Sequence, residues 1–511
     1  MKHFKIFLTT LLTLVLFSCT KLKEQFRSDI EQNNSATISA SDLLITAYNQ
    51  ISGTYMTGNL WHISQHTTDE TIAPTRGPDW DDNGQWRALH AHTWNADQGQ
   101  IGGAFSDLLN AQFAASNVLQ FNPSTQQAAE ARFIRALSIF EVADGWDQVP
   151  YREDLTNFKL LPKTLKGTEA VDFAATELNA ILNDLPDGGP AYVANKNAAR
   201  ALLMKIYLNR GIYANRAAPT FDPADMQQVI TLADQITASG KYSISGSDGF
   251  FDNFAPNNDA VSKENILTWL NQAGGPRGNN VRGTWFQIAH YNMNPGGWNG
   301  FATLSDFYDK FEAGDKRLGY DYRYPGALPN PKHEPNVGFF IGQRYDETTG
   351  DPLKDRKGQP LSFTREVHLR ETGNNLEVTG IRVNKYPFDY ATSSDQKNND
   401  WVVFRYADVL LMKAEALLRT GKATEGLVIV NGIRTLRGAT PLAALDEQAL
   451  LDERGREMYW EGWRRNDLIR FGKYLQPWQE KSADDPKNLL FPIPSSQLAV
   501  NANLVQNPGY Q

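Results

Sequence analysis

Oxygen-bearing side chains near the N-terminus are spaced as they are in calcium-binding loops. Asp79, Asp81, Asn83 and Gly84 match the start of such a loop, in which alternate residues ligate the ion. The twelfth position is His90 instead of the bidentate Glu, and no helical pair flanks the segment. We therefore expect no cofactor and keep Ca²⁺ at the Asp79–Asn83 loop only as a minor alternative.

Two histidines upstream have the spacing of zinc ligands on a helix. His62 and His66 are four residues apart, but Ile63 stands where a zinc protease carries its general-base Glu. The segment is also weakly helical in its pattern. We therefore expect no metal site here.

Adjacent acids could supply the two carboxylates of a glycosidase. The candidates are Asp69 with Glu70 and Asp81 with Asp82. Acids adjacent in sequence rarely face each other across a glycosidic bond, and the chain has no G-x-S-x-G nucleophile motif. We expect no catalytic residues, so the protein is predicted not to be an enzyme.

Composition excludes some partners. The 511 residues carry a formal net charge of −8, which argues against nucleic acid and against a basic membrane-binding surface. The chain is rich in aromatic residues, with 12 Trp and 19 Tyr. Such residues line surfaces that hold flat, weakly polar ligands, but they also fill cores, so their number alone decides nothing.

The N-terminus has the pattern of a lipoprotein signal peptide. A basic start, Met1–Lys5, precedes an apolar run, Ile6–Phe17, that is too short to span a membrane. Leu16 lies three residues before Cys19, the only cysteine, which cannot form an internal disulfide. We predict a signal peptide over residues 1–18, lipid attachment at Cys19 and a flexible tether over residues 19–39. The alternative is an ordinary secretory signal with an incidental cysteine.

Helical periodicity recurs in pairs along much of the chain. Apolar residues at helical spacing predict helices over residues 42–57, 101–121, 126–146, 168–185, 196–213, 223–239, 404–420 and 423–437. Successive helix pairs of this length predict a mainly α, tetratricopeptide-like scaffold over about residues 40–240 and 402–475. Residues 59–95 show little periodicity and predict a long ordered loop, which is usually functional.

The region from about residue 241 to 401 has a different character. Gly, Pro, Asn and aromatic residues dominate, with short β-like pieces at 264–269 and 376–386. Its Gly-rich pieces lack the Lys-Ser or Lys-Thr of a phosphate-binding loop. We predict a large irregular insert with few short strands, inside a single domain that spans residues 40–511 and ends in a tail over 476–511.

A charged stretch near the C-terminus, residues 453–474, is structural in either of two interpretations. Glu453, Glu457, Glu461 and Arg464 recur at helical spacing, and Gly462 interrupts them. They could form a solvated ion-pair face. Nearby Tyr and Trp residues favour, to about the same degree, a packed helix pair that carries a charged network inside the fold.

Several motifs, in order, resemble those of the SusD-like (RagB-like) outer-membrane lipoproteins of Bacteroidetes. The matching segments are Cys19, Glu130–Ala136, Val149–Tyr151, Arg405–Leu411 with Ala414–Ala416, Val430–Arg434, Glu453–Arg470, Phe491–Pro494 and Gln506–Tyr510. The match covers essentially the whole chain. Its most specific part is the pattern ERxxExxxEGxRxxDLxR, which begins at Glu453.

The resemblance implies a tetratricopeptide-like fold whose irregular half carries the ligand site. It implies a lipid-anchored protein of the outer membrane, facing the cell exterior, that captures an oligosaccharide. The ligand would pass to a SusC-like TonB-dependent transporter, and no cofactor or nucleic acid is implied. A RagB-type protein that captures peptides is the alternative, and a surface glycosidase is a more remote one.

A glycan would need an exposed aromatic plane beside Asp, Asn or Arg groups that bond to its hydroxyls. Two loop stretches have this composition, residues 76–86 and 298–299, and Trp285 and Tyr291 are weaker candidates. The predicted ligand-binding residues are Arg76, Asp79, Trp80, Asp82, Asn83, Trp86, Trp285, Tyr291, Trp298 and Asn299. Core packing is the alternative for each Trp.

Overall fold

The computed structural model describes residues 38–511 apart from residues 57, 154, 158, 276–281 and 393–395. The predicted signal peptide, Cys19 and nearly all of the tether lie outside the described residues. Residues Ala40–Gln511 form one compact unit. Helices account for 44% of residues and strands for 9%, so the predicted mainly α class is confirmed. None of the helices in the described part of the chain is long and apolar enough to span a bilayer.

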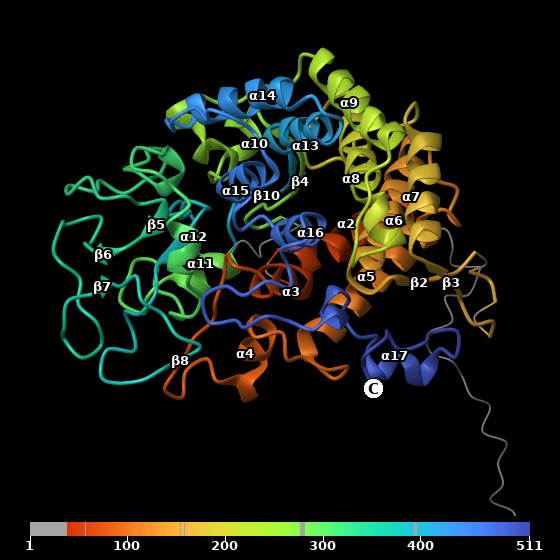
Figure 1. Cartoon of the computed structure of the whole chain (residues 1–511). Helices are drawn as coiled ribbons and strands as arrows, with labels where there is room; N and C mark the ends of the chain where they lie inside the picture. Colours follow the sequence, from red (N-terminus) through yellow and green to blue (C-terminus); the bar gives the residue numbers. More distant parts are fainter. Residues whose placement is uncertain (1–37, 57, 154, 158, 276–281, 393–395) are drawn as a thin grey trace, which may run out of the picture. The chain divides into compact units, whose positions relative to one another are not determined.

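Antiparallel helices build one half of this unit (Figure 1). Its helices are α2 (Ala40–Tyr55), α3 (Asn59–His66), α5 (Gly99–Val118), α6 (Thr125–Trp146), α7 (Thr168–Ile181), α8 (Lys196–Ala214) and α9 (Pro223–Ala238). Side-chain caps fix the start of some of these helices, and at α6 Ser124 and Gln127 form a capping box. Asp222 caps α9, whose first residue is Pro223.

Four more helices near the C-terminus return to this scaffold. They are α13 (Tyr406–Arg419), α14 (Ala423–Leu436), α15 (Glu447–Met458) and α16 (Arg464–Arg470), and a short α17 (Ser495–Val500) follows. Helix α13 packs against α8, α9, α14 and α15. The two helical parts, far apart in sequence, therefore pack against each other.

The region between them is irregular, as expected. Its helices are short: α10 (Asn258–Val261), α11 (Arg282–Ile288) and α12 (Ser305–Tyr308). Its strands are β4 (Asn265–Trp269), β5 (Gly338–Phe340), β6 (Gly342–Gln343), β7 (Ser362–Phe363), β8 (Arg370–Glu371), β9 (Arg382–Asn384) and β10 (Trp401–Arg405).

All described sheets are two-stranded. Strand β4 pairs antiparallel with β10, with Trp269 opposite Trp401, and this buried pair joins the insert to α13. The pairs β5–β9 and β6–β7 are antiparallel. The strand β1 (Thr75–Arg76) runs parallel to β8, whereas β2 (Gln148–Tyr151) pairs with β3 (Lys163–Lys166) in the helical half.

The predicted loop over residues 59–95 is partly wrong, because it contains α3 and α4 (Gln85–His90). Helix α3 is short, and its buried polar residues Gln65 and His66 hide the apolar stripe that would mark a helix in the sequence. The rest of the segment is irregular and includes the 3-10 turn η2 (Asp82–Gly84).

The charged stretch forms a buried network, so of the two interpretations the packed one holds. Helix α15 ends at Met458, and Glu461 lies in the turn before α16. Glu457 accepts hydrogen bonds from Arg317, Arg405 and Arg437 at 2.6–3.2 Å, and all of these side chains are buried. The network ties the last helices to the insert.

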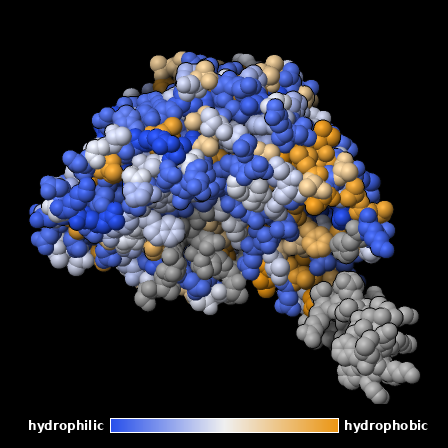
Figure 2. Space-filling model, turned by 90° about the horizontal axis from the view of Figure 1, so that it is seen from below, coloured by the Kyte–Doolittle hydropathy of each residue, from blue (hydrophilic) through white to orange (hydrophobic). Residues whose placement is uncertain are grey.

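The surface divides along the same line as the fold. Figure 2 shows hydrophilic residues over the side that carries the insert and apolar residues gathered over the helical side. The large apolar residues exposed in the helical half and near the C-terminus include Phe113, Leu160, Leu161, Val500 and Val505.

Candidate ligand-binding site

Two of the predicted stretches meet in space although they are more than 200 residues apart in sequence. The indole Nε1 of Trp80 donates a hydrogen bond to the carbonyl of Trp298 at 2.9 Å. The hydroxyl of Tyr291 donates to Asp79 Oδ2 at 2.9 Å. Spacing in the sequence gives no sign of this convergence, which the fold creates.

An open cavity of about 700 Å³ lies where these stretches meet. It is lined by Arg76, Pro78, Asp79, Asn299, Asp355, Arg356, Lys357, Asn374, Leu376 and Glu377. Seven of these ten residues were not predicted from the sequence. The only signal for most of them is that residues 354–358 and 372–375 are polar, turn-forming segments within the insert.

Arg356 is the central polar group of this cavity. Its guanidinium lies 3.9 Å from the centroid of the Tyr291 ring. Its Nε donates to Glu377 Oε1 at 2.6 Å, and Nη2 donates to Asp79 Oδ2 at 3.3 Å. The side chain stays 49% exposed, so it is held in place and still accessible.

The protonation of this group follows from its contacts. Partial burial lowers the pKa of Arg356, but the hydrogen bonds to Glu377 and Asp79 and the electrostatic interactions with Tyr291 and Glu377 together outweigh burial and raise it. Burial also raises the pKa of Glu377, but hydrogen bonds from the Arg356 backbone and His290 bring it below its usual value. Burial and the bond to Asp79 raise the pKa of Tyr291 to about 12. At neutral pH the cluster is therefore a charged, paired set.

Arg76 and Asn299 support the cavity wall. Both are buried, at 3% and 0% exposure. Arg76 donates to the carbonyls of Leu376 and Thr379 at 2.6 and 2.8 Å, and Asn299 donates to the carbonyl of Glu377 at 2.9 Å. Their predicted direct contact with ligand is at odds with this burial, because their polar atoms fix the 376–379 segment.

The four predicted tryptophans differ in exposure. Trp298 is 51% exposed and Trp80 is half-buried, whereas Trp86 and Trp285 are buried at 6% and 2%. Trp86 packs in a cluster with Trp80 and Phe301, and Trp285 stacks on Phe388. Of the four, only Trp298 presents a broad aromatic surface to solvent. The predicted platform role of Trp86 and Trp285 is at odds with their core positions.

Asp82 and Asn83 are exposed but face a different cavity. That cavity also includes Trp94, Asn95 and Asp97 and excludes Asp79. Asp82 Oδ2 accepts a hydrogen bond from Trp86 Nε1 at 2.7 Å. The predicted stretch 76–86 is therefore divided between two sites.

The candidate metal ligands turn to separate partners. Asp79 contacts Tyr291, Asp81 pairs with Arg87 and Asp82 binds Trp86. His66 is buried and His62 is partly buried, and desolvation lowers the pKa of His62 to about 4. Within the described ranges, no group of three or more His, Cys, Asp or Glu side chains is placed to hold a metal ion.

The paired acids are also structural in their contacts. Asp69 forms a two-point ion pair with Arg464 at 2.7 Å, and Glu70 accepts from the backbone N–H of Trp460 at 2.9 Å. Both are buried. Neither carboxylate lines the loop cavity, so this pair has no access to a ligand there.

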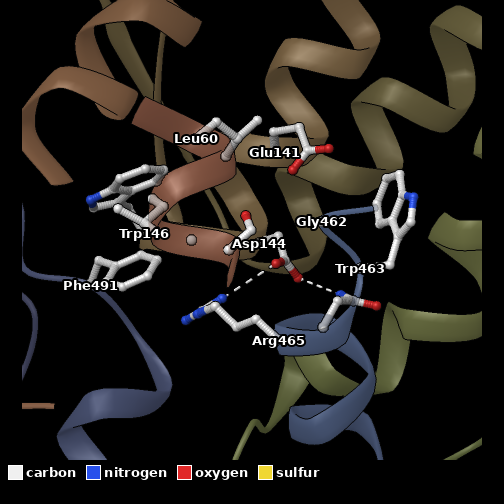
Figure 3. Close-up of a pocket in the computed structure, with 12 residues that line it drawn as sticks. Leu60, Glu141, Asp144, Trp146, Gly462, Trp463, Arg465 and Phe491 are labelled. Atoms are coloured by element: carbon white, nitrogen blue, oxygen red, sulfur yellow. Dashed lines mark hydrogen bonds and ion pairs between the residues drawn. The ribbon is translucent and has the colours of Figure 1, made fainter. Parts of the chain in front are cut away.

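A third, smaller cavity lies inside the helical scaffold (Figure 3). Its carboxylates already have protein partners, because Asp144 accepts from Asn466 at 2.7 Å and pairs with Arg465 at 3.4 Å. Glu141 accepts from the Tyr55 hydroxyl at 2.6 Å, and burial raises its pKa to about 7. This cavity lies between packed helices, and its carboxylates are already bonded within the fold. The open loop cavity is therefore the better candidate for a ligand site.

Comparison with known proteins identifies the architecture. The sequence profile of the SusD family matches residues 245–510, just over half of the chain. The chain belongs to the SusD family. The starch-binding protein SusD of Bacteroides thetaiotaomicron is 27% identical over 426 residues, which are 76% of this chain and 73% of that protein.

Solved structures give the same fold. A SusD superfamily protein of Parabacteroides distasonis superposes with a TM-score of 0.70 at 18% identity, covering 92% of this chain and 98% of that one. Surface glycan-binding protein A of Bacteroides fluxus gives a TM-score of 0.65 at 20% identity, covering 92% and 99%. The tetratricopeptide-like scaffold predicted from the helix pairs is therefore that of the SusD family.

Proposed function

We propose that this SusD-family protein binds an oligosaccharide or polysaccharide at the loop cavity beside Trp298. The observation that carries the proposal is the exposed Trp298 ring, whose sequence neighbour Asn299 lines a cavity rich in charged and amide side chains. An aromatic plane packs against the C–H face of a sugar, and charged groups bond to its hydroxyl rim. Relatives named as starch-binding and surface glycan-binding proteins support the choice of ligand class.

The protein acts in this proposal as a binding protein without catalysis. The buried acids Asp69 and Glu70 are paired inside the fold and cannot reach a glycosidic bond. Capture then depends on the affinity of the loop cavity alone. Released ligand passes to a SusC-like TonB-dependent transporter, and the support for that partner is membership of the family.

The same proposal places the protein at the outer membrane, facing the cell exterior and anchored by lipid at Cys19. The lipoprotein-type sequence around Cys19 supports the anchor. In the native host, Cys19→Ala should move the protein from the membrane to the soluble fraction, and solubilised wild type should retain a β-barrel transporter on affinity purification. A wild-type protein found only in the soluble fraction would contradict the anchor.

The binding test uses the mature protein in calorimetry against a polysaccharide panel. At least one glycan should bind, and no reducing sugar should be released from it. Trp298→Ala should weaken that affinity about tenfold or more, because a buried aromatic contact contributes about 1.5–3 kcal/mol.

Phe113→Ala is the matched control, because Phe113 is also exposed, at 43%, and lies on α5. It should leave the affinity unchanged. Binding to peptides alone would overturn the proposal in favour of peptide capture, and release of reducing sugar would indicate a glycosidase.

A further inference from the structure

The loop cavity combines equal numbers of opposite charges. Its lining contains three cations, Arg76, Arg356 and Lys357, and three carboxylates, Asp79, Asp355 and Glu377. Burial lowers the pKa of Arg76 to about 10, which still leaves it protonated at neutral pH. A cavity with this balance has no net attraction for an anion.

The exposed cation Arg356 is already neutralised. Arg356 contacts both Asp79 and Glu377 through separate nitrogens, at 3.3 and 2.6 Å. An acidic group that approached this guanidinium would come close to both carboxylates. Like charges at such short range disfavour binding, unless one of the existing ion pairs breaks.

The other two cations are also engaged. Arg76 directs its terminal nitrogens to backbone carbonyls below the cavity surface. Lys357 Nζ donates to the carbonyl of Asn374 at 3.0 Å, and its backbone N–H donates to Asp355 Oδ1 at 2.9 Å. Asp355, two residues before Lys357 in sequence, thus bonds its carboxylate to the Lys357 backbone.

Resting on the proposed glycan binding, we propose that this cavity selects uncharged sugars and rejects sugars that carry carboxylates. The group formed by Asp79, Arg356 and Glu377, called here the charge triad, is the selecting element. A sugar hydroxyl can donate to a carboxylate and accept from the guanidinium at once, without breaking the pairs. The carboxylate of a uronic acid can only accept, and its charge meets two fixed carboxylates.

The first experiment compares two forms of one polysaccharide. The neutral form is a glycan from the panel that the mature protein binds and that carries primary hydroxyls. The charged form is the same glycan oxidised at C6, so that carboxylates replace those hydroxyls while the linkages stay the same. Calorimetry should show at least tenfold weaker affinity for the oxidised form. The affinity for the neutral form should change less than twofold between 0.05 and 0.5 M salt.

A second experiment changes the triad. The isosteric double variant Asp79→Asn with Glu377→Gln leaves Arg356 without carboxylate partners and adds two units of positive charge. Its affinity for the oxidised glycan should rise at least tenfold over that of wild type, whereas its affinity for the neutral form should fall. Glu377→Gln alone, the smaller change, should shift the preference in the same direction, and circular dichroism confirms folding.

The matched control is Asp97→Asn with Glu425→Gln, which changes net charge equally at exposed positions outside the cavity. It should keep the wild-type preference. The inference is overturned if wild type binds the oxidised and the neutral forms with equal affinity. It is also overturned if the double variant keeps the same preference as the control. If no glycan binds at all, the proposed function itself fails, which is a different outcome from binding without selection.

Discussion

Trp298 and Trp80 differ at the scale of single residues in how they serve the site. Trp298 is exposed, whereas Trp80 lies behind it and holds its backbone through the indole N–H. Trp80 has a φ of +63° and Asn299 one of +55°, which are sparsely populated for residues with side chains. Such backbone strain often occurs at functional sites, and the packing around Trp80 maintains it here.

Gly300 makes this close packing possible. A Cβ atom at Gly300 would lie 2.2 Å from Trp80 Cε2, so Gly300→Ala should displace the Trp80 ring. We expect a loss of about 1–3 kcal/mol in the free energy of unfolding, measured in urea, together with weaker glycan binding. Gly432→Ala, where no atom lies within 4 Å of the added Cβ in helix α14, should be neutral or slightly stabilising. Equal stabilities of the two variants would contradict this packing.

Trp80→Phe separates support from contact. The change keeps an aromatic ring but removes the hydrogen bond to the Trp298 carbonyl, so we expect to lose about 1 kcal/mol of stability. Glycan affinity should fall less than in Trp298→Ala. If calorimetry gives the larger loss for Trp80→Phe, then Trp80 itself is the principal contact.

Residue types in the sequence point to part of this site. Loops that combine polar and aromatic residues indicate Asp79, Trp80 and Trp298 as candidates. In the structure all three are partly or well exposed. Trp86 and Trp285 differ from these residues because they are buried. Their burial depends on tertiary packing, which no local sequence pattern reveals. Arg356 and Glu377 cannot be predicted from local sequence, because they lie 65 and 86 residues after Tyr291 and the fold alone places Arg356 over the Tyr291 ring and beside Glu377.

The helix pair α15–α16 is the element that joins the two halves of the fold. Glu457 on α15 lies among Arg317 from the insert, Arg405 at the end of β10 and Arg437 after α14. Burial raises the pKa of Glu457, but these three cations outweigh burial and hold it well below its usual value. The carboxylate is thus needed to balance buried positive charge.

Glu457→Gln should therefore lower the free energy of unfolding by about 3–5 kcal/mol, because it removes the one carboxylate that these three buried guanidiniums share. Glycan affinity should stay within twofold of wild type in the folded fraction, since the cavity lining does not include this residue. Glu425→Gln, at an exposed position in the first turn of α14, is the control and should change stability by less than about 0.5 kcal/mol. A large loss of glycan affinity in a well-folded Glu457→Gln variant would show instead that this network supports the binding site.

Elements with a strong cap or a long apolar stripe could be predicted from the sequence. Helices α6, α9 and α13 begin within two residues of their predicted starts. The short α3 and α4 could not, because their stability comes from packing against the core and not from propensity. The sequence also does not decide whether the charged residues of α15 face solvent or the interior, because the same helical spacing is compatible with both arrangements.

The response of the whole molecule to pH depends on carboxyls buried without full compensation. Burial raises the pKa of Glu70 to about 8 and that of Glu347 to about 7. A raised carboxyl pKa means that the folded state binds a proton that the unfolded state has released above about pH 4.5. The contribution of such a group to stability therefore falls as pH rises from about 4.5 to its folded pKa.

Glu70→Gln isolates one of these groups. Between pH 6.5 and 8, wild type should lose up to about 1.4 kcal/mol of stability per pH unit from this site, and the variant should lack that part of the slope. Urea unfolding at both pH values measures the difference, with Glu425→Gln as the control that keeps the wild-type slope. Parallel slopes for wild type and Glu70→Gln would show that Glu70 is ionised throughout this range.

The anchoring of the cavity wall by Arg76 through backbone carbonyls has a consequence for protein engineering. Because these bonds do not depend on the side chains at positions 374–377, those side chains can be exchanged while the wall stays in place. A combinatorial library at positions 356, 357, 374 and 377 should therefore contain many folded members, each with a different recognition surface on an unchanged frame. Such a library would make this chain a starting point for reagents that distinguish closely related polysaccharides.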